Sequence, residues 1–191
     1  MPSPKLAVLA SGRGSNYKAI QEAILNDQLD AEIIILITDK EKAPAREIAR
    51  SNGTEEMYIP YDRKDREVFE REAARIIKEK DVDLVILAGF MRLITPYFIN
   101  EFEGRMLNIH PSLLPNFKGL DAQTQAFEAG VKEAGCTVHV VTEEMDAGPI
   151  ISQRKVPVFE NDTVEALSAR ILVEEHILYP EAISKYWDSV A

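Results

Sequence analysis

The chain has 191 residues, of which 46% are hydrophobic and 28% charged, so it is long enough for one domain with a sizeable core. Its formal net charge of −10 at pH 7 argues against a broad nucleic-acid-binding face. A single cysteine, Cys136, excludes a disulfide within the chain and a cysteine metal cluster.

Targeting and membrane signals are equally sparse. No apolar run approaches the roughly 20 residues of a membrane span. The first residues also lack the apolar core of a signal peptide. The three histidines are scattered, so we expect no structural zinc and no other metal. The sequence therefore predicts a cytoplasmic protein of one domain, residues 1–191.

Strands and helices alternate through the first half of the chain. Apolar runs predict strands at 5–10, 32–38, 57–59 and 82–88. Helical spacing and capping signals predict helices at 15–27, 43–52 and 64–80. This alternation is typical of a parallel sheet with right-handed crossovers and helices on both faces.

The second half of the chain does not keep this alternation of strands and helices. The patterns predict a helix at 95–102, a strand at 105–109, a loop at 111–120, a helix at 121–130, a strand at 136–142, a strand pair or one long strand at 148–159 and a closing helix at 162–179. Because the late strands follow each other without a helix, we expect an antiparallel edge. The fold class is therefore α/β and Rossmann-like, with a mainly parallel central sheet.

The first strand joins the first helix through a glycine-containing loop at 11–16. Free amides at a helix start, together with the helix dipole, form an anion site, and glycine allows close approach of the backbone. Tyr17 stands where a dinucleotide fingerprint needs glycine, and the loop also lacks the end of a nucleotide P-loop. A monophosphate fits this loop better than a dinucleotide, although a plain tight turn is an equally good interpretation of the loop alone.

Two polar residues, Asn108 and His110, lie two apart near the end of the fifth predicted strand, and Pro111 ends it. The spacing places both side chains on one face, at the carboxyl end of a strand, where open α/β sheets bind ligands. An amide can stabilise an oxyanion, and an imidazole can move a proton near neutral pH. An isolated Asn-x-His more often caps loop backbone, but the rest of the chain favours a catalytic interpretation.

Other candidate residues follow neighbouring strands. Asp146 lies in a loop after the strand at 136–142 and could orient an imidazolium, although an ordinary turn aspartate is the simpler alternative. The apolar segment 89–94 could line a slot for a flat ring or simply pack. His139 lies inside a strand, which favours a supporting or core histidine, and His176 lies on the last helix.

These segments together resemble the phosphoribosylglycinamide formyltransferase family, the folate-dependent enzymes of purine synthesis. The resemblance is carried by ASGRGSN at 10–16, LAGFMRLITP at 87–96, LNIHPSLLP at 107–115, TVHVVTEEMDAGPII at 137–151 and EEHILYP at 174–180. It covers nearly the whole chain and implies a Rossmann-like formyltransferase fold.

The resemblance also implies roles for particular residues. The N-terminal half would bind the phosphate of glycinamide ribonucleotide, and the C-terminal half would bind 10-formyltetrahydrofolate and carry the catalytic residues. The implied catalytic residues are Asn108, His110 and Asp146. The implied ribonucleotide-binding residues are Gly14, Ser15, Asn16 and Glu175. The implied folate-binding residues are Arg66, Met91, Arg92, Leu93, Ile94, Asn108, Thr142 and Met145.

Expected partners are these small molecules, with no nucleic acid and no membrane, and a homodimer stays open. At residues 119–123 some family members carry histidines that this chain lacks, so substrate contacts there stay open. Rival interpretations are a formyltransferase acting on initiator methionyl-tRNA or on a sugar amine, a formyltetrahydrofolate hydrolase, and a non-catalytic phosphate-binding module. The net charge of −10 argues against the tRNA enzyme.

Overall fold

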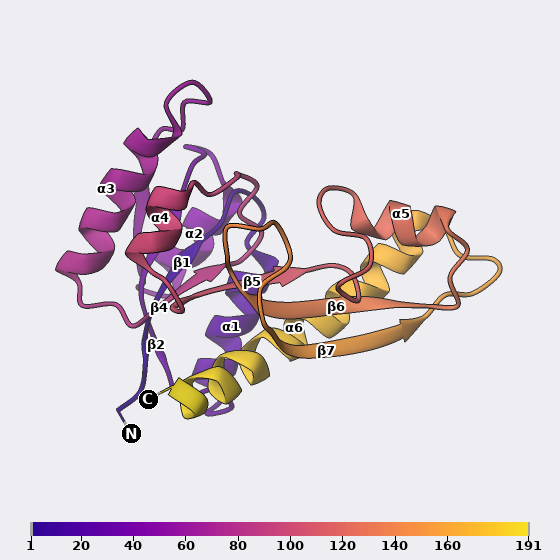
Figure 1. Cartoon of the computed structure of the whole chain (residues 1–191). Helices are drawn as coiled ribbons and strands as arrows, with labels where there is room; N and C mark the ends of the chain where they lie inside the picture. The colour runs from indigo at the N-terminus through magenta and orange to yellow at the C-terminus, as the bar shows by residue number, and fades with distance from the viewer. Residues whose placement is uncertain (1, 191) are drawn as a thin grey trace.

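The computed structural model describes residues 2–190, and one seven-stranded sheet organises them (Figure 1). The strands are β1 (Lys5–Leu9), β2 (Glu32–Thr38), β3 (Glu55–Tyr58), β4 (Leu84–Leu87), β5 (Met106–His110), β6 (Glu133–Val140) and β7 (Ile150–Pro157). Their order across the sheet is β3-β2-β1-β4-β5-β6-β7. The pairs from β3 to β5 are parallel, whereas β5–β6 and β6–β7 are antiparallel. The expected α/β class with an antiparallel edge is confirmed.

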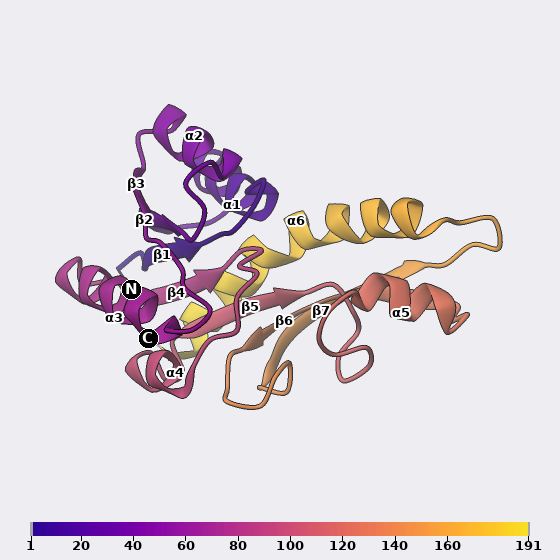
Figure 2. The ribbon, with the colours of Figure 1, turned by 90° about the horizontal axis from the view of Figure 1, so that it is seen from above.

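Helices cover both faces of this sheet (Figure 2). They are α1 (Ser15–Leu25), α2 (Pro44–Ser51), α3 (Arg66–Glu79), α4 (Pro96–Glu101), α5 (Ala122–Glu128) and α6 (Val164–Val190). Alternate residues of β1 separate the two layers, because Leu6 and Val8 pack with α1 and α6 while Ala7 and Leu9 pack with α3 and α4. None of the helices within residues 2–190 has the length and apolar character needed to cross a membrane.

The closing helix is longer than the sequence indicated. The expected end was Tyr179, because Pro180 cannot donate the bond that the carbonyl of His176 would accept. The helix nevertheless continues to Val190 with Pro180 inside it. Tyr179, Ala182 and Ile183 are fully buried on both sides of the proline, so packing against the sheet holds the helix together where the local hydrogen bond is lost.

Other differences are small shifts of strand ends. β3 begins at Glu55 and β6 at Glu133, each earlier than expected. The segment 148–159, for which a strand pair or one strand was open, forms the single strand β7. Each shift follows from pairing with a neighbouring strand, which extends the ladder beyond the apolar residues that mark it in sequence.

Candidate active site

The two central polar residues of the candidate site, Asn108 and His110, lie at the carboxyl end of β5. Leu107 and Ile109 belong to the core layer that packs against α6. Asn108 and His110 alternate with them and therefore lie on the opposite face of the strand. The structure thus places the amide and the imidazole side by side, as the spacing of two predicted.

The imidazole of His110 lies between two oxygen acceptors. Its Nε2 is 2.8 Å from the carbonyl oxygen of Phe117, and its Nδ1 is 3.4 Å from Oδ2 of Asp146. Because a carbonyl can only accept, Nε2 carries a hydrogen. A proton on Nδ1 would then face the carboxylate, so this ring can hold and pass on a proton in contact with Asp146.

His139 is a member of the cluster that the sequence did not assign to the site. It pairs with Asn108 across β5 and β6, and its Nε2 lies 3.2 Å from Nδ2 of Asn108 and 3.5 Å from Oδ1 of Asp146. Its Nδ1 donates to the carbonyl of Val140 at 3.0 Å, and its Nε2 is the ring nitrogen that faces both the amide and the carboxylate. The expectation of a supporting histidine fits this position.

Asp146 joins the two histidines from the turn between β6 and β7. The amide of Gly119 donates to its Oδ2 at 2.8 Å. Burial alone would raise the pKa of Asp146. Bonds from His139 and Gly119 and the charge of His110 outweigh burial, and the pKa lies below its usual range. Gly148 permits this turn, because a Cβ there would lie 1.8 Å from the carbonyl oxygen of Val140.

The loop before α1 presents backbone amides at the same edge of the sheet. The first intrahelical bond runs from the amide of Lys18 to the carbonyl of Gly14, so the amides of residues 15–17 have no helical partner. Gly14 has φ +74°, and a Cβ on it would lie 2.6 Å from Cβ of Ala45 at the start of α2. The sequence predicts glycine there for the close approach of a phosphate, and the structure adds that the packing of α2 against the loop itself requires it.

Asn16 and Glu175 connect this loop to α6. Nδ2 of Asn16 donates to Oε2 of Glu175 at 2.8 Å, and Oδ1 of Asn16 is buried without a partner. Burial raises the pKa of Glu175, and the bond from Asn16 only partly offsets this. The carboxyl group of Glu175, Oδ1 of Asn16 and the free amides of the loop are therefore the polar groups gathered at this place.

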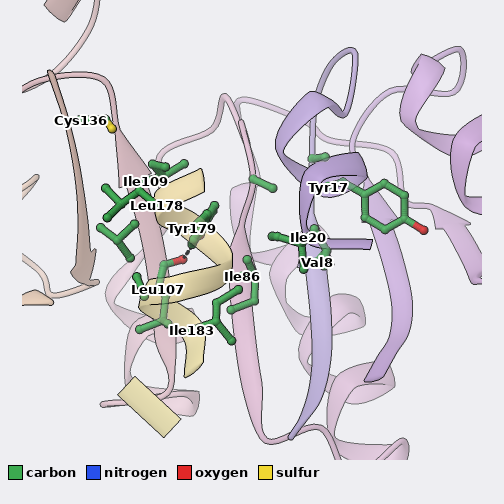
Figure 3. Close-up of a cluster of buried hydrophobic side chains, with 14 of the residues drawn as sticks. Val8, Tyr17, Ile20, Ile86, Leu107, Ile109, Cys136, Leu178, Tyr179 and Ile183 are labelled. Carbon is green, nitrogen blue, oxygen red and sulfur yellow. Dashed lines mark hydrogen bonds between the residues drawn. The ribbon is translucent and has the colours of Figure 1, made fainter. Parts of the chain in front are cut away.

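One turn further along α6, Tyr179 connects this helix to the strands beneath the cluster. Figure 3 shows its side chain among the buried apolar residues Ile86, Leu107 and Ile183. The hydroxyl donates towards the carbonyls of Leu87 in β4 and Leu107 in β5, at 3.0 Å each. The helix that carries Glu175 is thereby fixed to the two strands that carry segment 89–94 and the Asn-x-His pair.

The segment 89–94 divides into packed and exposed residues. Phe90 stacks on Phe69, with ring centroids 5.5 Å apart, and Ile94 packs against the same core. Met91 and Leu93 are exposed, as are Leu120 and Met145 from the neighbouring loops. Packing is therefore confirmed for Phe90 and Ile94, whereas the slot for a flat ring stays a prediction, for which Met91, Leu93 and Met145 are the exposed apolar side chains.

The remaining predicted residues lie at the rim. Arg66 is the exposed first residue of α3, and within residues 2–190 no hydrogen bond or ion pair joins it to His110, His139 or Asp146. Thr142 donates through Oγ1 to the carbonyl of Glu144 at 3.3 Å in the loop after β6. The guanidinium of Arg92 turns towards Asp39 on the β2 side of the sheet.

Taken together, the cluster is suited to acid–base chemistry and to stabilising an oxyanion by hydrogen bonds. Among the described residues, no group of three histidine, cysteine or carboxylate side chains is arranged to hold a metal ion. A hollow of about 670 Å³ lies between α1 and α6 and shares only Ser15 with the site residues. We locate the site by its chemistry at the strand ends and not by that hollow.

Comparison with known proteins gives a family match. The model of the formyl transferase family matches residues 4–183. Phosphoribosylglycinamide formyltransferase of Escherichia coli (strain K12) is 41% identical over 184 residues, covering 96% of this chain and 87% of that protein. The trifunctional purine biosynthetic protein adenosine-3 of Chironomus tentans is 42% identical over 96% of this chain. The chain spans only 14% of the length of that relative.

Solved structures agree with this match. Glycinamide ribonucleotide transformylase 1 from Symbiobacterium toebii has a TM-score of 0.93 and 44% identity, covering 98% of this chain and 89% of that one. A formyltetrahydrofolate deformylase from Pseudomonas syringae has a TM-score of 0.91 and 29% identity, covering 97% of this chain and 62% of that one.

Proposed function

Because the chain belongs to the formyl transferase family, we propose that it transfers the formyl group of 10-formyltetrahydrofolate to the amine of glycinamide ribonucleotide. This is a step of purine biosynthesis, and the phosphoribosylglycinamide formyltransferase of Escherichia coli at 41% identity supports it. The single observation that carries the proposal is the contact of His110 and His139 with Asp146 beside Asn108.

Glycinamide ribonucleotide binds at the loop before α1 in this proposal. The free amides of residues 15 and 16 hold the phosphate, and Gly14 gives the loop its shape. Glu175 accepts from hydroxyl groups of the ribonucleotide, replacing or adding to the bond from Asn16. The folate lies across Met91 to Ile94 and the loop from Thr142 to Met145, with Arg66 at the rim. The exposure of Met91, Leu93 and Met145 supports that placement. In this proposal each of the two substrates is held by residues from both halves of the domain.

The reaction forms one C–N bond and breaks another. The neutral amine attacks the formyl carbon, and the carbonyl oxygen takes the negative charge of a tetrahedral intermediate. The N–H groups of Asn108 and a protonated His110 stabilise that oxygen by hydrogen bonds. Asp146 favours the charged imidazole, accepts the proton lost by the amine and passes it to the leaving N10 of the folate as the bond between N10 and the formyl carbon breaks. Formate is not released, and no covalent enzyme intermediate forms.

The proposed step requires His110 to leave one of its present partners. Both of its ring nitrogens face protein oxygens, from Phe117 and Asp146. A substrate oxygen can approach only if one of these contacts lengthens when the ligands bind. Asn108 needs no such change, because its Nδ2 carries a second hydrogen besides the one directed at His139.

One assay tests the function and its closest rival together. The protein is incubated with a 10-formylfolate donor, with and without glycinamide ribonucleotide, and donor loss is followed by absorbance. Donor loss only when the amine is present supports the proposal. Equal loss without the amine would favour a hydrolase such as the Pseudomonas syringae deformylase, and no loss in either arm would contradict both.

A further inference from the structure

A buried aspartate at the same edge of the sheet has no part in the reaction above. Asp39 directly follows β2, and its side chain is 0% exposed. Its Oδ2 accepts a hydrogen bond from Nε of Arg92 at 2.6 Å. The guanidinium also lies over the ring of Tyr61, with Cζ 4.5 Å from the centroid. Arg92 is therefore fixed along one edge and on one face.

The chain has a second aspartate–arginine–aromatic group, which differs from this one in the guanidinium nitrogens that bind protein acceptors. Asp162 binds Arg170 through both oxygens, Oδ1 to Nη2 at 2.7 Å and Oδ2 to Nη1 at 2.8 Å. Arg170 lies over Phe159 at the same 4.5 Å. Its side chain is 26% exposed and that of Asp162 is 6% exposed, close to the values for Arg92 and Asp39. There the terminal nitrogens of the guanidinium are used within the protein.

Arg92 uses its guanidinium differently. Only Nε binds Asp39, and Oδ1 of that carboxylate is buried without a partner. Across residues 2–190, neither Nη1 nor Nη2 of Arg92 donates to a protein acceptor. The side chain is 21% exposed, so the edge formed by these two nitrogens stays accessible. That edge has the geometry that binds a carboxylate or phosphate through two parallel hydrogen bonds.

The position of Arg92 indicates which ligand meets that edge. It lies between Met91 and Leu93, whose exposed side chains form part of the proposed folate surface. The amide of Met91 donates to Oγ of Ser11 at 2.8 Å, so the segment is also tied to the loop that follows β1. An oxyanion bound by Arg92 would therefore belong to a molecule lying along this segment.

We propose that Asp39 and Tyr61 are positioning residues that hold the Nη1–Nη2 edge of Arg92 towards an oxyanion of the folate co-substrate. The inference rests on the proposed function and names a carboxylate of the glutamyl tail as the ligand group. An arginine that is already fixed loses less rotamer freedom on binding than a free one. Removal of Asp39 should therefore weaken donor binding through Arg92 and leave the chemistry unchanged.

The test is the separation of KM and kcat in Asp39→Ala. The KM for the formylfolate donor should rise about tenfold, the loss expected for one charge-assisted hydrogen bond. The KM for glycinamide ribonucleotide and kcat should change less than about twofold. In an Arg92→Met background, Asp39→Ala should have no further effect on the donor KM. A formyl donor that lacks the glutamyl group should show no dependence on Asp39.

Two further variants separate positioning from folding. Asp39→Asn keeps the size and an acceptor for Nε of Arg92, and it should restore most of the donor KM. Asp162→Ala breaks the matched pair elsewhere and should lower Tm without changing any KM. An unchanged donor KM in Asp39→Ala, an equal loss in the Arg92→Met background, or a rise in the ribonucleotide KM instead would each overturn the proposal. An inactive wild-type protein would instead overturn the proposed function.

Discussion

The loop before α1 and the cluster around Asp146 reach the same edge of the sheet, but they are built in opposite ways. The loop offers backbone amides within a single strand–turn–helix unit, fixed by the close approach of Gly14 to Ala45. The cluster depends on side chains from β5, β6 and two loops. Substitutions in the loop should therefore act by changing its conformation. Substitutions in the cluster should act by removing single functional groups.

The largest effect should come from the cluster. His110→Ala removes the only side chain that contacts both Asp146 and the carbonyl of Phe117 among those described here. Turnover should fall by about 10²–10⁴-fold, as for other residues in proton transfer and oxyanion stabilisation. Circular dichroism and Tm should show a folded protein. Asp188→Asn, an exposed carboxylate near the end of α6, is the control and should keep full turnover.

The second effect concerns the shape of the loop. Gly14→Ala places a Cβ 2.6 Å from Cβ of Ala45 at φ +74°, whereas a Cβ at Gly12 meets nothing within 4 Å. Gly14→Ala should lower the free energy of unfolding by about 1–3 kcal/mol. It should also weaken ribonucleotide binding measured by calorimetry. Gly12→Ala should cost under about 1 kcal/mol, and equal losses for the two would refute the packing explanation.

The difference between the regions also explains what could be read from sequence. The loop, the helices on each side and the strand-end position of Asn108 and His110 all depend on residues within about ten positions, so local pattern predicts them. His139 and the amide of Gly119 reach Asp146 only through the register of β5 with β6 and through loop closure. The alternation of Thr137, His139 and Val141 was the one signal that could have placed His139 on the site face.

Long-range packing accounts for the other errors. The predicted end of α6 was wrong because a proline indicates only a local preference for ending a helix. The burial of Tyr179 and Ile183 overrides that preference. Nothing in the sequence singles out Asp39, because only the fold brings Arg92 to it. Contacts between residues more than fifty positions apart leave no trace in a single sequence.

Replacing Glu175 should weaken binding of the ribonucleotide and at the same time raise the stability of the fold. Its pKa is raised in the folded protein, so ionisation costs stability once pH rises above the unfolded value of about 4.3. Glu175→Gln removes that cost. Tm should increase by a few degrees at pH 7, since about 1 kcal/mol shifts Tm of a domain this size by about 2–4 °C. The gain should vanish below about pH 4.

The same substitution should raise the KM for glycinamide ribonucleotide and leave the donor KM unchanged. Calorimetric scans at pH 4 and pH 7, together with steady-state kinetics, check both parts. A lower Tm at pH 7 would contradict the electrostatic argument, and an unchanged ribonucleotide KM would contradict the proposed contact.

The smallest effect should come from the surface pair that spans the two loops of the cluster. Nζ of Lys118 lies 3.2 Å from Oε1 of Glu144, whose side chain is 78% exposed. Lys118→Met should change the free energy of unfolding by about 0–1 kcal/mol, and less at high salt. Urea titrations at two salt concentrations measure this. A loss well above that range would mean that charge, and not the bond from Gly119 to Asp146, holds the loops together.

The central claim is that His110 and Asp146 act as one unit, and a double-mutant cycle of turnover tests it most directly. His110→Ala, Asp146→Asn and the double variant are compared with the wild-type protein in the formyl transfer assay. If the pair acts together, the double variant should be no more than about threefold slower than the slower single variant. Losses that multiply in the double variant would contradict the claim and assign the two residues independent roles.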